Sequence, residues 1–289
     1  MRTWADLGIE LSDGARGEVR TTCPQCSPTR RKNRVACLAV NAETGTWLCH
    51  HCGWKGGLHG RLHPSPLPPL LRSPAQPDER KHTALRRVWG ETCPITAADP
   101  VDLYLRQRGI ALPVTDMPAV LRFHPHLRYL HEAGQRTYHP AMVARVDDPN
   151  GQGVTLHRIY LTSDGQKADV PTVKKLMSPA IPGATRGGAI RLYLAGETLA
   201  ITEGVETALA VRLATGLPVW AALCAGGMAR LIVPPEVHLV VICADHDAAG
   251  LDAAQALAQR LLVEQRRVKI LTPDIPGADW ADLQEVGHG

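Results

Sequence analysis

Four cysteines in the N-terminal part of the chain are spaced as metal ligands. They form two pairs, Cys23-Pro-Gln-Cys26 and Cys49-His-His-Cys52, with 22 residues between them. Each Cys-x-x-Cys turn delivers two thiolates, and two turns complete the tetrahedral set that Zn²⁺ prefers. We therefore expect one structural Zn²⁺ in a small β zinc ribbon. A redox dithiol is the alternative for one pair, but it needs no second pair.

The other potential ligands near this site are less specific. His50 and His51 lie inside the second pair, and either can in principle replace a cysteine; the simpler interpretation leaves them facing solvent or beside the ligands. The remaining cysteines have no partner at ligand spacing, so we expect them in the hydrophobic core. They are Cys37, Cys93, Cys224 and Cys243.

A basic segment lies between the cysteine pairs, and two tryptophans flank the second pair. Cations that hold phosphates and aromatic rings that stack on bases together suit single-stranded nucleic acid. A solvated loop and two core tryptophans are the alternative. Residues 1 to 90 carry a formal charge of +7 and the rest −3, which favours a polyanion at the N-terminal end. The candidate nucleic-acid contacts are Arg30, Arg31, Lys32, Arg34, Trp47 and Trp54.

Three carboxylates follow apolar segments in the C-terminal third. Residues 199–202 lead directly into Glu203, and residues 238–244 lead into Asp245-His-Asp247. If both segments are parallel strands, their carboxyl ends meet at one edge of the sheet. Grouped carboxylates repel one another, and Mg²⁺ or Mn²⁺ offsets that repulsion in sites for phosphoryl chemistry. The alternative, three ordinary helix N-terminal acids, explains each acid but not their pairing.

Predicted strands and helices, which must position these carboxylates, alternate clearly after residue 196. Strand and helix in alternation predict a parallel sheet covered on both faces. The expected strands are 199–202, 218–223, 238–244 and 267–271, and the expected helices are 205–215, 228–233 and 248–263. The preceding part is mixed α+β, with helices at 84–89 and 100–108, strands at 141–146 and 154–161, and a turn at 147–151.

Six prolines between residues 60 and 80 predict an extended tether, because proline lacks the backbone donor that helices and sheets need. The chain is thus expected to be an α/β protein with four parts. These are a zinc ribbon (1–59), a Pro-rich linker (60–82), an α+β middle subdomain (83–195) and a C-terminal domain with a parallel sheet flanked by helices (196–289).

Composition excludes several classes of protein. The 289 residues are 44% hydrophobic, too apolar for a disordered chain. Acidic residues stand where a signal peptide needs an apolar run, and the longest uncharged stretch, 213–229, is too short to span a membrane. We expect a cytoplasmic protein whose cysteines are thiols or metal ligands.

The carboxylate pattern resembles a known family. Glu203-Gly204 after one apolar strand and Asp245-x-Asp247 after a second resemble the Toprim domain of bacterial-type primases, type IA and II topoisomerases and certain nucleases and recombination proteins. The resemblance covers about residues 196 to 285. It implies that Asp245 and Asp247 coordinate Mg²⁺ and that Glu203 is a general acid/base or a further metal ligand.

The wider chain resembles the primases of phages and mobile elements. The ribbon and tether, the segment Tyr104-Leu-Arg-Gln-Arg-Gly-Ile110, the run Glu203-Gly-Val-Glu-Thr-Ala-Leu-Ala210 and the late Asp279-Trp-Ala-Asp282 carry this resemblance. The chain has no Gly-Lys dipeptide and so no P-loop, which makes any helicase a separate partner.

We therefore expect a DNA primase that uses ribonucleoside triphosphates to make short RNA primers on single-stranded DNA during replication. The expected cofactors are one structural Zn²⁺ and catalytic Mg²⁺ or Mn²⁺. Glu203, Asp245 and Asp247 are the expected catalytic residues and magnesium ligands, with Glu206 close enough to assist. Arg158, Lys174 and Lys175 are candidates for holding nucleotide phosphates, or else surface cations. The alternatives are a Toprim nuclease or topoisomerase-like enzyme, and a non-catalytic zinc-ribbon loading factor that binds single-stranded DNA.

Overall fold

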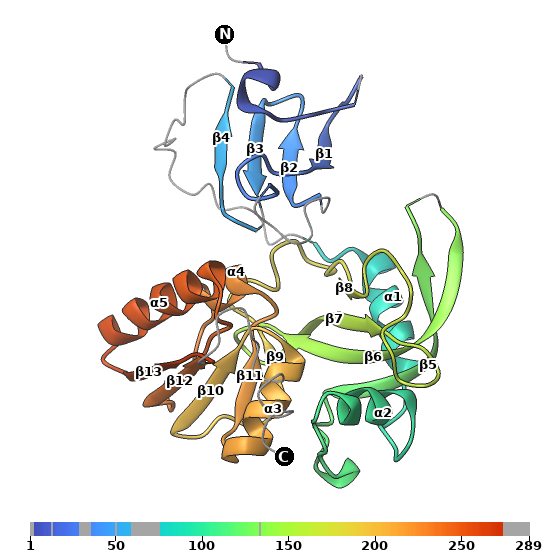
Figure 1. Ribbon diagram of the computed structural model, residues 1–289, viewed down its shortest axis with the longest axis vertical. Coiled ribbons are helices and arrows are strands. Elements are labelled where there is room, and N and C mark those ends of the chain that lie inside the picture. The colour runs from blue at the N-terminus through green and yellow to red at the C-terminus, as the bar shows by residue number, and fades with distance from the viewer. Residues whose placement is uncertain are drawn as a thin grey trace. The chain divides into compact units, whose positions relative to one another are not determined.

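The computed structural model describes residues 3–12, 14–28, 36–49, 51–58, 76–132 and 134–273. The chain divides into two compact units, Met1–Ser73 and Pro74–Gly289 (Figure 1). Some of the residues named above lie outside the described parts. They are most of the linker, the basic segment with Arg30, Arg31, Lys32 and Arg34, and also His50, Asp279 and Asp282.

The N-terminal unit is a small antiparallel sheet. Its strands are β1 (Glu18–Thr21), β2 (Leu38–Asn41), β3 (Thr46–Cys49) and β4 (Lys55–Gly57), in that spatial order. A short 3-10 helix, η1 (Ala5–Leu7), precedes them. Side chains along β3 alternate between exposed and buried, so one face of the sheet covers a core of few side chains. A core this small needs additional stabilisation.

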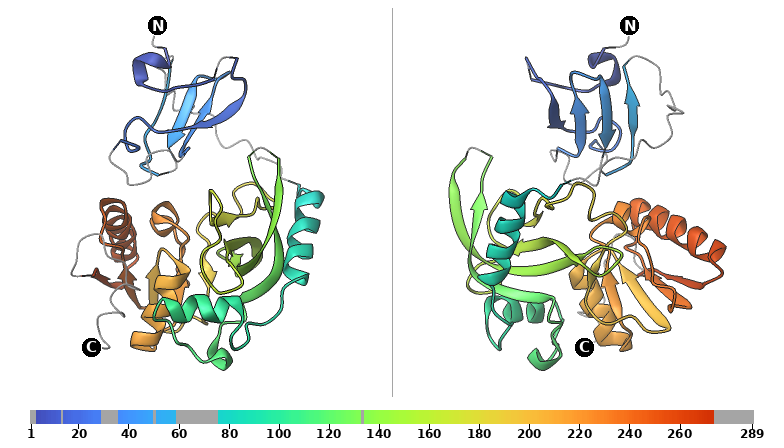
Figure 2. Two further views of the ribbon diagram at one scale, coloured as in Figure 1. Left: turned by 45° about the vertical axis from the view of Figure 1, so that its right-hand side comes forward. Right: turned by 180° about the vertical axis from the view of Figure 1, so that it is seen from behind.

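The middle part of the second unit is an antiparallel sheet with helices on both faces. Its strands, in spatial order, are β5 (Leu121–Leu130), β6 (Arg136–Asp147), β7 (Gly153–Tyr160) and β8 (Lys174–Leu176). Helix α1 (Glu79–Gly90) is longer than predicted, while α2 (Pro100–Gln107) is close to the prediction. The carboxylates of Asp78 and Asp99 accept backbone N–H groups at the two helix starts. The β5–β6 hairpin extends beyond the rest of its sheet (Figure 2).

The C-terminal part has the predicted parallel sheet. The strands β10 (Thr198–Thr202), β11 (Val219–Ala221), β12 (Leu239–Cys243) and β13 (Arg267–Leu271) are parallel, and β9 (Ile190–Arg191) pairs with β11 in the antiparallel sense. The strand order is β13-β12-β10-β11-β9. Helices α3 (Val205–Thr215) and α5 (Ala248–Val263) have the predicted bounds.

The helix predicted at 228–233 is wrong. The structure instead has α4 (Ala225–Met228), which contains Gly226 and Gly227. Glycine disfavours helix, so the sequence of this segment does not indicate that it is helical. Tertiary packing overrides that preference here, since a Cβ on Gly227 would lie only 2.0 Å from the carbonyl oxygen of Ala222.

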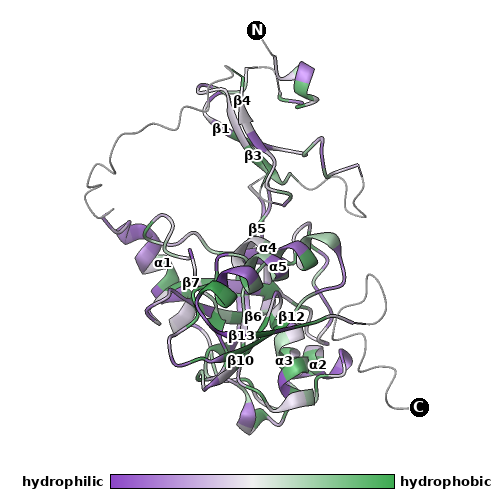
Figure 3. Cartoon of the chain, turned by 90° about the vertical axis from the view of Figure 1, so that its left-hand side faces the viewer, coloured by the Kyte–Doolittle hydropathy of each residue, from purple (hydrophilic) through white to green (hydrophobic). Residues whose placement is uncertain are grey.

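Alternate residues of the parallel strands enter two different cores. Leu199 and Ile201 of β10 pack with α4 and α5, whereas Ala200 packs on the opposite face with α3 and with the middle sheet. Hydrophobic residues accordingly dominate α3 and the central strands (Figure 3). The middle sheet therefore covers one face of the parallel sheet, together with α3.

No helix in the described part of the chain is both long and apolar enough to cross a bilayer.

Candidate functional site

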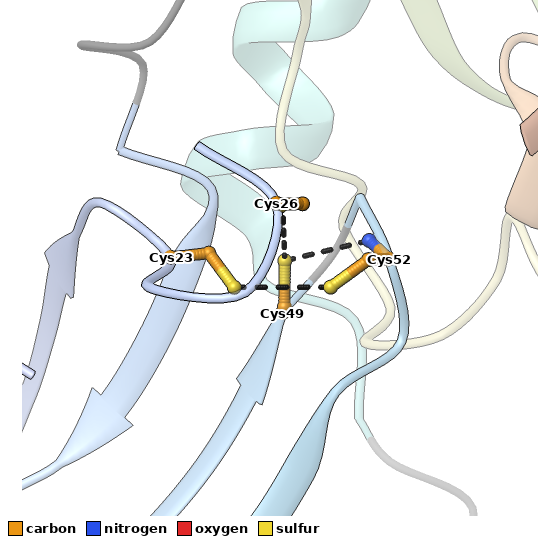
Figure 4. A group of neighbouring side chains, drawn as sticks. All are labelled: Cys23, Cys26, Cys49 and Cys52. Carbon is orange, nitrogen blue, oxygen red and sulfur yellow. Dashed lines mark hydrogen bonds between the residues drawn. The ribbon is translucent and has the colours of Figure 1, made fainter. Parts of the chain in front are cut away.

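The four predicted zinc ligands converge at one end of the N-terminal sheet (Figure 4). The Sγ atoms of Cys23, Cys26, Cys49 and Cys52 all lie within 4.8 Å of one another. The Cys23–Cys52 and Cys26–Cys49 sulfur distances are both 3.7 Å. Four thiolates bound tetrahedrally at about 2.3 Å lie about 3.8 Å apart, so this arrangement fits Zn²⁺. Burial raises the pKa of Cys23 to about 11, so without a cation this group stays protonated.

A fifth cysteine lies beside this cluster. The Sγ of Cys37 is 3.7 Å from that of Cys49 and 3.9 Å from that of Cys26. Cys37 is buried, as predicted, but the spacing gave no sign of its position. Its neighbour Leu38 pairs with Cys49 across β2 and β3, and that register brings Cys37 to the site.

Two of the other cysteines contradict the prediction of a core position. Cys243 is buried, but Cys93 and Cys224 are exposed. Cys224 follows β11 as the N-cap of α4, and Cys93 forms a single bridge with Phe123 outside the named strands. Both cysteines lie next to paired strands, but their side chains are not enclosed by the sheet.

The two tryptophans proposed as nucleic-acid contacts, Trp47 and Trp54, differ in accessibility. Trp47 is buried between Trp4 and Trp54, with ring centroids 6.1 and 5.2 Å away. Its ring also covers Gly56, where any Cβ would be only 2.3 Å from it. Trp47 is thus a core residue without a free face for a base. Trp54 is half-buried at the edge of this group and remains a candidate contact.

The three carboxylates come from the carboxyl ends of adjacent parallel strands, as predicted. Glu203 follows β10, and Asp245 and Asp247 follow β12. A Cβ placed on Gly250 would lie 3.1 Å from Oε1 of Glu203, 3.3 Å from Oδ1 of Asp247 and 2.7 Å from the backbone oxygen of Asp245. Oxygen atoms from all three residues therefore lie close to Gly250, where a side chain would crowd them.

The charges of these carboxylates oppose one another. Burial, then the charges of Asp245 and Asp247, raise the pKa of Glu203 to about 7. Asp247 also caps α5, since its Oδ1 accepts the N–H of Gly250 at 2.7 Å. Within the described ranges, no carboxylate group is as compact as the cysteine cluster, which is expected of charges that repel.

This edge fits a hard divalent cation. Oxygen donors and an excess of negative charge are what Mg²⁺ and Mn²⁺ bind. The charge of a cation bound by these oxygens would offset the repulsion that raises the pKa of Glu203. Asp245 and Asp247 would hold the ion, with Glu203 as a further oxygen donor.

Glu206 does not belong to this edge. Its carboxylate is buried and turned toward the middle sheet, where Oε1 accepts the hydroxyl of Tyr104 at 2.7 Å and pairs with Nζ of Lys174 at 2.6 Å. Glu206 is therefore not placed as a metal ligand, and the expectation that it assists the metal site stays a prediction. Glu203 precedes α3 and does not lie on it, so helical spacing does not bring the two side chains together.

The three predicted phosphate-binding cations do not share a site. Lys174 and Lys175 are consecutive strand residues, so their side chains point to opposite faces of the sheet. Lys174 faces the parallel sheet and Glu206. Lys175 lies over the ring of Tyr129 at 3.8 Å, on the face where Arg158 contacts the ring and hydroxyl of Tyr160.

The β5–β6 hairpin carries a surface that sequence reasoning missed. The rings of His126 and Tyr138 stack in parallel at 4.8 Å, and Tyr138 is 50% exposed. Arg128 lies opposite Tyr138, and the exposed Arg136 lies opposite Leu130. Exposed aromatic rings beside arginines suit stacking with bases and contact with phosphates. The alternation of His and Arg with apolar residues along 124–130 is the signal that could have located it.

This surface lies on the same side of the middle sheet as the parallel sheet. Tyr138 and Met142 are four positions apart on β6 and so share a face. Met142 belongs to the core that joins the two sheets. We refer to His126, Arg128, Arg136 and Tyr138 as the hairpin surface.

Family models match two segments of the chain. Residues 198–288 match the model described as the Toprim domain, and residues 79–192 match one described as a Domain of unknown function (DUF7146). No curated protein matches this sequence. Residues 198–288 are thus similar to the Toprim domain, which confirms the resemblance seen in this part of the sequence.

Solved primase structures resemble the fold at low sequence identity. The zinc-binding and RNA polymerase domains of the Aquifex aeolicus primase are 17% identical, with a TM-score of 0.49, over 96% of this chain and 78% of that chain. A DNA primase domain from Pseudomonas aeruginosa is 17% identical, with a TM-score of 0.47, over 73% and 74% of the two chains. The RNA polymerase domain of the Mycobacterium tuberculosis primase is 17% identical, with a TM-score of 0.46, over 71% and 75%.

The zinc assignment predicts that replacing a ligand, Cys49, has a different effect from replacing the neighbouring Cys37. Cys49→Ala is expected to lose the zinc and the fold of the ribbon, because the small core depends on the metal. Cys37→Ala is expected to retain one zinc per chain. Zinc content by mass spectrometry and thermal unfolding measure both effects. Retention of zinc by Cys49→Ala, or its loss from Cys37→Ala, would contradict the assignment.

The charge conflict at the carboxylate edge predicts a pH-dependent stability. The pKa of Glu203, about 7 in the fold, lies above its ordinary value of 4.5, so the folded state keeps a proton that the unfolded state has lost. Stability of the wild type therefore falls as the pH rises between these values. Without Mg²⁺ or Mn²⁺, Glu203→Gln is expected to raise the free energy of unfolding by roughly 2 kcal/mol at pH 8.

This gain should shrink toward pH 5, where the folded wild type is protonated and therefore uncharged at this position. Chemical denaturation at the two pH values measures it. The control is Glu197→Gln, since Glu197 is exposed just before β10. A Glu203→Gln variant that is no more stable than wild type at pH 8 would rule out a destabilising charge at Glu203.

Proposed function

We propose that this chain is a DNA primase that joins ribonucleotides into short primers on a single-stranded DNA template during replication. The observation that carries the proposal is the convergence of Glu203, Asp245 and Asp247 at one edge of a Toprim sheet. The four-thiolate ribbon on the same chain supports it, since a rigid zinc platform suits template binding. We further propose that the protein acts in the cytoplasm with a separate replicative helicase.

The carboxylate edge has the residues that nucleotidyl transfer requires. Asp245 and Asp247 hold the divalent cation, which when bound supplies positive charge to the phosphate under attack and to the leaving pyrophosphate. Glu203 either binds the same cation or accepts the proton of the attacking 3′-hydroxyl at Oε1. A pKa near 7 suits a group that takes and returns a proton at neutral pH.

The template would be held by two surfaces on the two units. The candidates on the ribbon are Trp54 and the basic residues Arg30, Arg31, Lys32 and Arg34. The candidate on the middle sheet is the hairpin surface. Of the three cations proposed for nucleotide phosphates, Lys174 lies on the Toprim side of the middle sheet but pairs with Glu206, and Arg158 and Lys175 face the opposite side.

Incorporation of labelled ribonucleotides on random single-stranded DNA with Mg²⁺ or Mn²⁺ tests the proposed activity. Asp245→Ala is expected to lower incorporation by more than about a hundredfold, since even outer partners of a metal site cost 10- to 100-fold. Asp252→Ala, which removes an exposed acid from α5, is the matched control and should behave as wild type.

Other outcomes identify the alternatives. Degradation of the template without synthesis would indicate a Toprim nuclease and would refute the primase proposal. Priming in a cell extract that survives Asp245→Ala but is lost with Cys49→Ser would indicate a zinc-ribbon loading factor.

The hairpin surface predicts a specific loss of template binding. Tyr138→Ala is expected to weaken binding of a single-stranded oligonucleotide about tenfold, because stacking on one base contributes about 1–3 kcal/mol. Tyr138→Phe keeps the ring and should bind within about twofold of wild type. Fluorescence anisotropy with a labelled oligothymidine measures both. Equal affinities for the Ala and Phe variants would exclude stacking at this position.

A further inference from the structure

Two residues that the proposed reaction does not use directly meet inside the second unit. Tyr104 lies on α2, at the start of the Tyr-Leu-Arg-Gln-Arg-Gly segment, and Glu206 lies in the first turn of α3. Although 102 positions separate them, the hydroxyl of Tyr104 donates to Oε1 of Glu206 at 2.7 Å. Lys174 on β8 reaches the same oxygen at 2.6 Å. Three elements thus meet at one carboxylate atom.

This carboxylate is ionised despite its burial. Glu206 is only 4% exposed, and burial alone would raise its pKa. The charge of Lys174 and the hydrogen bonds from Lys174 and Tyr104 outweigh burial and hold the pKa at about 2. His157, buried nearby, has a pKa lowered to about 4 by burial, so it is neutral and Lys174 supplies the positive charge.

The Glu206 carboxylate lies close to the turn that follows Glu203. Gly204 separates Glu203 from the first residue of α3, and no side chain caps that helix. Oε2 of Glu206 lies 3.6 Å from the position of a Cβ on Gly204. The hydroxyl of Thr202 donates to the carbonyl of Gly204 at 2.9 Å. Thr202 thus fixes the turn by a hydrogen bond, and the Glu206 carboxylate lies close to it.

This ion pair is only partly buried. The Glu206 carboxylate is buried, whereas the Lys174 side chain is 45% exposed, so removal of Lys174 would leave a buried charge uncompensated. The contacts at Glu206 relate α3 to α2 and to β8 in one geometry.

We propose that Glu206 is a positioning residue, which Lys174 and Tyr104 hold against the middle sheet so that the Glu203 carboxylate stays close enough to Asp245 and Asp247 to share one divalent cation. The proposal rests on the metal site of the proposed function and deepens it. It makes the cation affinity of the Toprim edge depend on Lys174, a residue of the middle sheet.

Binding of Mn²⁺ alone to the zinc-loaded full chain, followed by electron paramagnetic resonance, tests this proposal. Lys174→Met is expected to weaken Mn²⁺ binding about tenfold and to change the spectrum of the bound ion, as loss of an outer partner of a metal site does. Lys174→Arg keeps the cation and is expected to bind within about twofold of wild type. Glu264→Gln removes an acid from the surface pair with Arg260 and serves as the control.

A second variant covers the case in which Lys174→Met fails to fold. Tyr104→Phe removes one hydrogen bond and no charge, and it is expected to weaken Mn²⁺ binding about threefold. Wild-type affinity and spectrum in folded Lys174→Met or Tyr104→Phe, with only a lower unfolding temperature, would overturn the proposal and leave the ion pair as a stabilising contact.

The same measurement distinguishes this proposal from the one on which it depends. If Mn²⁺ binding survives Asp245→Asn, the carboxylate edge is not the metal site, and both proposals fail. If Asp245→Asn abolishes binding while Lys174→Met and Tyr104→Phe bind as wild type, the metal site stands and the positioning role alone fails.

Discussion

A hydrophobic core shared by two sheets determines where the carboxylates lie. Met142 and Ile159 of the middle sheet belong to the same core as Val205 and Leu209 of α3 and Val219 of β11. Each fully buried side chain of this size contributes about 1.5–3 kcal/mol. Because α3 starts two residues after Glu203, fixing α3 by burial also fixes the turn from which Glu203 extends. The hydrophobic core therefore supplies the stability, and the polar contacts at its edge adjust the position of one carboxylate.

The two candidate metal sites differ because their surroundings differ. The ribbon has a core of few side chains, so an ion bound by the thiolates would help to hold it folded. The Toprim sheet is packed on both faces by apolar side chains. Its carboxylates instead carry an unrelieved repulsion, which appears in the raised pKa of Glu203. A site that is folded but electrostatically unsatisfied suits a cation that binds and leaves with substrate.

Local patterns predicted most elements of the second unit, and long-range contacts account for the errors. The apolar runs of β10 and β12 and the bounds of α3 and α5 follow from periodicity. The position of Cys37 depends on the register of β2 with β3, and the contact of Tyr104 with Glu206 joins residues 102 positions apart. Neither of these contacts can be predicted from the local spacing of residue types. The three carboxylates were found because strand polarity alone brings them together.

The cationic side chains on the two faces of the middle sheet have different surroundings. On the face that α1 covers, Lys175 lies over Tyr129 and Arg158 over Tyr160, so these positive charges are engaged by aromatic rings of the protein itself. On the opposite face, Arg128 and Arg136 are exposed beside Tyr138. This second face continues into the core beneath the Toprim sheet. A polyanion that contacts this face of the middle sheet would therefore meet exposed arginines and the half-exposed ring of Tyr138, on the side that faces the Toprim sheet.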